Sequence, residues 1–176
     1  MQMTQTILMA GAALWMTANA LAAGPETFKV SEFNYKRPAK WEWVENRSSM
    51  RAAQLKVVDG KAEAEVVFFY FGEGGGGGTQ ANVDRWYGQF AEPKDKLNPK
   101  SEEKTVGGVK ITYVQAEGTY NSGPPLGQKV PMPGFALLGA IVEGKQGSVF
   151  VKMTGPKELV KAATADFKGM IEGALK

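Results

Sequence analysis

A run of apolar residues from Val66 to Phe71 constrains the fold of this chain more than any other feature. The run reads VVFFYF, and β-branched and aromatic residues of this kind favour strands. Because successive side chains of a strand point to opposite faces, this strand would be apolar on both of them. Such a strand belongs inside a sheet that is covered on both sides. The chain is therefore expected to form a layered domain.

The segments around this run predict further strands. Ala53, Leu55 and Val57 alternate with polar residues before Asp59-Gly60, a dipeptide typical of a hairpin turn. Short strands with comparable patterns are expected at 28–30, 109–117, 135–143 and 148–154. The sequence of tandem hairpins indicates antiparallel pairing.

Two segments show the spacing of amphipathic helices, at 80–91 and after Gly155-Pro156, where proline would take its favoured first position. Their apolar faces consist of Val83, Trp86, Tyr87 and Phe90, and of Leu159, Ala163, Phe167, Met170 and Ile171. We therefore predict an α+β fold, with a mainly antiparallel sheet of about five to seven strands packed with two helices in an α/β/α sandwich-like arrangement.

The first 22 residues have the pattern of a signal peptide. Ile7 to Met16 is apolar, and Ala20-Leu21-Ala22 fits the small-x-small rule for cleavage. The apolar stretch is shorter than the roughly 20 residues that span a bilayer. We expect cleavage after Ala22, a lead-in segment over 23–40, and one globular domain over 41–176. The mature protein would be periplasmic or secreted, with no integral membrane segment.

Composition excludes several classes of chemistry. The chain has neither cysteine nor histidine, which excludes disulfides, thiolate nucleophiles, Cys-based zinc sites and Ser-His-Asp machinery. The net charge is only +3, and lysine and arginine are scattered, whereas nucleic-acid binders gather their positive charge on one face. We expect no nucleic-acid partner, no metal and no cofactor.

A glycine run is the first candidate for a ligand site. Gly75, Gly76, Gly77, Gly78 and Thr79 lie between a strand and the start of a helix, where backbone N–H groups and the helix dipole can hold an anion. In this interpretation the Thr79 side chain caps the helix. The alternative is a flexible connector, because no Lys-Ser/Thr follows as a phosphate-binding P-loop requires.

A proline- and glycine-rich segment is the second candidate. Residues 121–134 predict a long loop, and Tyr120, Asn121 and Ser122 at its start could bind a polar ligand. The alternative is a surface loop without a role. If a site exists, the sequence favours an edge formed by 74–79 together with 120–125. Residues 92–104 are expected to form a solvated loop.

Carboxylates and the remaining aromatic residues favour structural roles. Glu63, Glu65, Asp84 and Glu102-Glu103 show no spacing that would place two carboxyl groups across a cleft, as a glycosidase requires. They are interpreted as solvated surface residues. Tryptophan and tyrosine could form a platform for sugars, but they fall at core-type positions.

Several stretches resemble a group of small, uncharacterised exported bacterial proteins. They are MRAAQLKV, AEVVFFYFG, ANVDRWYGQF, KTVGGVKITYV, EGTYNSG, ALLGAIVE and VFVKMTGP. The resemblance implies export and no particular activity. The order of elements also resembles the PsbP-like α/β/α sandwich, in which an antiparallel sheet lies between helices. A fold alone does not determine function.

The sequence thus favours an exported, non-enzymatic binding or accessory protein that takes an unknown small ligand or an envelope protein. A hydrolase that uses carboxylates or a Ser/Lys pair is one alternative. A cell-envelope module that docks a partner through an exposed sheet edge is another. Oligomeric state is open at this stage.

Overall fold

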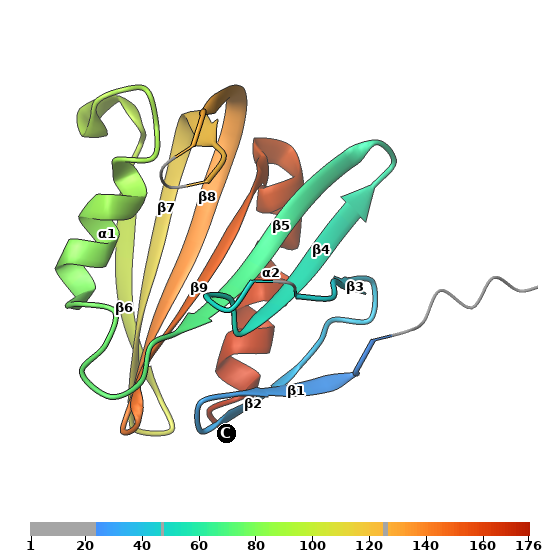
Figure 1. The fold of residues 1–176 in the computed structure, drawn as a ribbon, viewed down its shortest axis with the longest axis vertical. Coiled ribbons are helices and arrows are strands. Elements are labelled where there is room, and N and C mark those ends of the chain that lie inside the picture. The colour runs from blue at the N-terminus through green and yellow to red at the C-terminus, as the bar shows by residue number, and fades with distance from the viewer. Residues whose placement is uncertain (1–23, 47, 125–126) are drawn as a thin grey trace, which may run out of the picture.

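The computed structural model describes residues 24–46, 48–124 and 127–176. A seven-stranded sheet, a two-stranded hairpin and two α-helices make up the fold (Figure 1). The elements are β1 (Thr27–Val30), β2 (Phe33–Lys36), β3 (Glu42–Trp43), β4 (Ala53–Asp59), β5 (Ala62–Tyr70), α1 (Thr79–Tyr87), a short 3-10 helix η1 (Lys94–Lys96), β6 (Lys100–Val106), β7 (Val109–Ser122), β8 (Val130–Gly144), β9 (Gly147–Pro156) and α2 (Lys157–Gly173). The predicted α+β class and antiparallel sheet are confirmed.

The strand order of the sheet is β3-β4-β5-β9-β8-β7-β6. The apolar strand β5 lies inside the sheet as predicted, and Val66, Val67 and Phe68 are all buried. The expectation of cover on both faces fails for Phe71, which follows the end of β5 and is 45% exposed. At Asp59 the chain turns into β5 through a two-residue hairpin, with Gly60 at a φ of 59°.

The sheet is covered differently on its two faces. The long helix α2 packs across β4, β5, β8 and β9 on one face, and its predicted apolar residues are buried there. On the other face lies α1, which ends at Tyr87 instead of the expected residue 91. Trp86 packs directly over Gly139 of β8, so α1 covers the β7–β8 side of that face. On this second face, no helix of the described residues lies over β4 and β5 (Figure 1).

The segment 23–40 does more than lead into the domain. Strands β1 and β2 form a hairpin on the α2 side of the sheet. Phe28, Val30, Phe33 and Tyr35 from this hairpin are buried in the same apolar cluster as β4, β5 and α2. The hairpin is consequently part of the core.

The prediction of one long loop over 121–134 is wrong. Strand β7 continues to Ser122 and β8 already begins at Val130, so the two strands form a long hairpin. We call the ends of these strands, residues 118–122 and 130–134, the β7–β8 arm. Pro131 and Pro133 are tolerated there because β9 pairs with β8 only from Phe135 onward, which leaves one side of the arm without a neighbour.

Residues 92–104 are likewise not a simple loop. They contain η1 and the first residues of β6, which is the edge strand of the sheet next to β7. The sequence KSEEKT is exposed along this edge. Charged side chains on an edge strand oppose pairing with another chain, which explains why a strand can have so polar a sequence.

Candidate functional site

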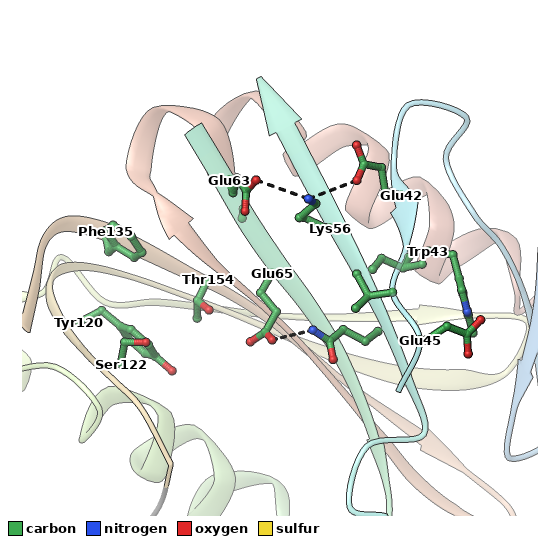
Figure 2. Close-up of a pocket in the computed structure, with 14 residues that line it drawn as sticks. Glu42, Trp43, Glu45, Lys56, Glu63, Glu65, Tyr120, Ser122, Phe135 and Thr154 are labelled. Carbon is green, nitrogen blue, oxygen red and sulfur yellow. Dashed lines mark hydrogen bonds and ion pairs between the residues drawn. The ribbon is translucent and has the colours of Figure 1, made fainter. Parts of the chain in front are cut away.

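The part of the sheet face that α1 leaves uncovered carries an open groove of about 650 Å³. Strands β4, β5 and β9 form its floor, the segment around β3 forms one wall, and the β7–β8 arm forms the opposite wall (Figure 2). We call this hollow the sheet groove. Trp43 lies at one wall, and Tyr120 and Phe135 lie at the other. Its size suits a small molecule.

Charged and amide side chains on the groove floor are paired with one another. Glu65 of β5 accepts hydrogen bonds from Gln54 at 2.8 Å and from Arg51 at 2.5 Å. Further along, Lys56 lies 3.3 Å from Glu42 and 3.4 Å from Glu63. Hydrogen bonds to these two carboxylates raise the pKa of Lys56. Glu65 is therefore matched by Arg51, while Glu42 and Glu63 share the single positive charge of Lys56.

Lys152 adjoins the groove, because its ammonium group contacts the lining residue Tyr120, and it differs from these paired groups. It comes from β9, two residues before the lining residue Thr154 and on the same sheet face. Its Nζ donates to Tyr120 Oη and to Gln89 Oε1, both at 3.0 Å. Tyr120 Oη in turn donates to Gln89 Oε1 at 3.0 Å. Three segments far apart in the sequence thus meet at one ammonium group.

Burial changes the acid–base properties of this cluster. It lowers the pKa of the Lys152 ammonium to about 8, because the charged form loses solvation. Burial also raises the pKa of Tyr120 to about 12, so that its hydroxyl keeps the proton at neutral pH. Perturbed groups that line or adjoin a cleft mark it as a functional-site candidate.

The glycine run has a packing role in the structure. The side-chain amide of Asn82, which is 2% exposed, donates to the carbonyl oxygens of Gly76 and Gly78 at 2.9 Å. The expected cap is wrong: Gly78 is the N-cap of α1 and Thr79 is its first residue. The Thr79 hydroxyl donates to Glu143 at 2.9 Å, so a carboxylate of the protein already lies beside the first turn. Ligand binding at this loop stays a prediction.

Two glycines of the run are expected to differ sharply when replaced. Gly76 and Gly77 have φ values of 81° and 79°, but only at Gly76 would a Cβ approach the Phe150 ring, at 2.6 Å. We expect Gly77→Ala to lower the free energy of unfolding by about 1 kcal/mol through backbone strain. Gly76→Ala should lower it by about 2–4 kcal/mol because overpacking is added. Urea denaturation of both variants checks this, and equal losses would contradict the packing role.

The three predicted residues of the second candidate are separated by the strand geometry. Tyr120 and Ser122 both line the sheet groove. Asn121 lies between them on β7, so its side chain points to the opposite face of the arm. The residues 74–79 and 120–122 flank opposite ends of α1, since Phe90, beyond the helix, pairs with Tyr120. The expected common edge is therefore not formed.

Sequence reasoning missed the residues that complete the groove. Glu65 was interpreted as solvated surface, and Lys152, Gln89 and Arg51 were not singled out. One signal was present in the sequence: Lys152 interrupts an otherwise apolar strand, VFVKM. A lysine at a core-type position requires an explanation, because lysine is almost never fully buried unless it is paired.

A second, smaller hollow of about 310 Å³ lies on the opposite sheet face, between β7 and the first turns of α2. Lys100, Lys157 and Lys161 border it, and all three are exposed. Exposed ammonium groups are screened by water and salt and interact weakly with anions. The sheet groove is the stronger candidate because Lys152, which adjoins it, is partly withdrawn from water.

Two features are absent from the described residues. Within 24–46, 48–124 and 127–176, no cluster of three or more carboxylates is arranged to hold a metal ion. In the same part of the chain, no helix has the length and apolar character needed to cross a membrane.

Comparison with known proteins adds little to this geometry. No family model and no curated protein matches the sequence. Solved structures that are similar include PA94 from Pseudomonas aeruginosa, a protein of unknown function described as a suggested regulator. The two chains are 12% identical, and the match covers 83% of this chain and 92% of that one with a TM-score of 0.47. The candidate site therefore rests on the described contacts alone.

Proposed function

We propose that this protein is an exported, non-enzymatic binding module that holds a small polar ligand in the sheet groove. The observation that carries the proposal is the groove itself, in which polar side chains from β4, β5, β7 and β9 converge on a hollow of about 650 Å³. Sites for small molecules combine such a hollow with a few convergent polar groups. The signal-like pattern of residues 1–22 supports export.

The groove suits a ligand with both flat and hydroxylated surfaces. Phe135 offers a ring surface (Figure 2). Ser122, Thr154 and Gln54 offer hydroxyl and amide groups, whereas the Trp43 ring packs against Phe28 on the opposite face of the sheet. Aromatic rings pack against the C–H faces of a ligand, while hydroxyl and amide groups fix its orientation through hydrogen bonds. This combination fits a small hydroxylated organic molecule.

A blocking substitution tests the proposal. In Ser122→Trp a large ring would enter the groove from the arm, whereas Asn121→Trp adds the same ring to the other face of the arm. We expect calorimetric or thermal-shift screening with sugars, polyols and organic acids to find a ligand. Ser122→Trp should weaken its binding at least tenfold, and Asn121→Trp should not.

Other outcomes would contradict the proposal in distinct ways. Equal binding by both tryptophan variants would place the ligand outside the groove. Hydrolysis of a bound molecule would support the alternative of a carboxylate- or Ser/Lys-based enzyme. A purified periplasmic or secreted product that still begins at Met1 by intact-mass analysis would contradict export with cleavage after Ala22.

A further inference from the structure

Among the described residues, no carboxylate forms an ion pair with the ammonium group of Lys152. Its two hydrogen-bond acceptors, Tyr120 Oη and Gln89 Oε1, are both neutral. Within the described residues, no carboxylate lies within 4 Å of its Nζ. Lysine has three protons to donate, so one remains for a further acceptor.

The described residues of the neighbouring elements do not supply that acceptor. The carboxylate of Glu65 on β5 favours the charged form of Lys152, but it is already bonded to Arg51 and Gln54. The other charges that act on Lys152 are positive and come from separate elements: Arg51 before β4, Arg85 on α1 and Lys129 before β8. The end of the groove beside Lys152 is therefore electropositive and partly desolvated, conditions under which an anion binds well.

The cationic neighbours are themselves committed to other partners. The Arg85 guanidinium donates to Asn82 Oδ1 and to the Gly76 carbonyl oxygen. Lys129 Nζ donates to the carbonyl oxygens of Gly123 and Pro124. Arg85 and Lys129 are also exposed, whereas Lys152 is partly buried, so a single bound negative charge is enough to compensate it.

We propose that Lys152, positioned by Tyr120 and Gln89, binds the carboxylate group of the ligand that occupies the sheet groove. This inference rests on the proposed function and names the chemical class of the ligand, a small hydroxylated monocarboxylic acid. A carboxylate carries one charge and accepts from Nζ at the end of the groove beside Lys152. Its hydroxylated part extends past Thr154 towards Glu65 and Gln54.

The acidic residues further out explain why the ligand is singly charged. Beyond Glu65, the floor continues to Glu63, and Glu42 lies on the adjoining β3. Hydroxyl groups can donate to these carboxylates, whereas a phosphate or a second carboxylate would be repelled by them. The groove is cationic at one end and acidic at the other, and a neutral polyol chain with one acidic terminus matches that order.

Gluconate and its uncharged amide, gluconamide, test the inference directly. We expect gluconate to bind by calorimetry and gluconamide to bind at least tenfold more weakly. Lys152→Met should remove this preference, while Lys161→Met, at an exposed lysine on the opposite sheet face, should keep it. In NMR spectra of protein labelled with ¹³C-lysine, gluconate should raise the pKa of Lys152, because a bound anion favours the charged amine.

The possible failures are distinguishable. If both compounds bind equally and Ser122→Trp abolishes their binding, the groove function stands and the carboxylate contact is wrong. If inorganic phosphate binds more tightly than gluconate, the assigned ligand class is wrong. Binding of gluconate that Lys152→Met leaves unchanged also overturns the inference. If no compound in the sugar, polyol and organic-acid panel binds, the proposed function and the inference both fail.

Discussion

Replacing Trp86 with alanine should lower the free energy of unfolding by about 3–5 kcal/mol. The Trp86 side chain is 5% exposed and fixes α1 to the sheet by packing over Gly139. The helix has only nine residues, fewer than an isolated helix needs for stability in water, so it depends on this packing. Urea denaturation followed by circular dichroism measures the loss.

A surface methionine and a second substitution provide the controls. Met50 is 59% exposed, and Met50→Ala should change the stability by no more than about 0.5 kcal/mol. A Cβ added at Gly139 would lie 2.2 Å from the Trp86 ring, so Gly139→Ala should destabilise the wild type. The same change should cost much less in the Trp86→Ala background, because the ring is gone. Additive losses would show that Trp86 does not hold α1 in this way.

Replacing Lys152 with methionine should stabilise the protein by about 3 kcal/mol at pH 7. The pKa of Lys152 is about 8 in the folded chain, against an ordinary value of 10.5. Below pH 8 the amine is charged in both the folded and the unfolded state, and the folded state bears the full cost of its desolvation. Methionine removes this charge and keeps a side chain of similar length.

The stabilisation expected from Lys152→Met depends on pH. Between about pH 8 and 10.5 the unfolded chain binds the Lys152 proton and the folded chain does not, so wild-type stability rises with pH through this range. The difference between Lys152→Met and the wild type should therefore shrink as the pH approaches 10.5. Denaturation curves at pH 6, 8 and 10 measure it, with Lys161→Met as the exposed-lysine control. A constant difference across these pH values would contradict a desolvated Lys152.

These two predictions separate stability from binding. A residue kept for packing loses stability when it is truncated, as expected for Trp86. Lys152 should behave in the opposite way, since its replacement raises stability and removes carboxylate binding. Sites that bind ligands often retain such locally unfavourable groups.

Local patterns in the sequence determined most of the elements. The run at Val66 to Phe68, which is apolar on both faces, predicted an inner strand, and Asp59-Gly60 predicted the hairpin turn before it. Both signals can be recognised in the sequence because side-chain alternation and turn conformation depend on residues that are close together in the chain. The spacing of Leu159, Phe167 and Ile171 predicted the buried face of α2 for the same reason. These features determined the fold class before any long-range contact was known.

Only the tertiary structure decided where the groove lies and what it contains. Val67 pairs with Lys152, 85 positions further along the chain, and no periodic pattern encodes that choice of partner. Prolines favour loops, yet Pro131 lies in a strand because the side of β8 that faces away from β7 has no paired strand there. A pattern reports whether a position is buried, whereas the chemistry of Lys152 depends on which distant groups, Tyr120 and Gln89, fold against it.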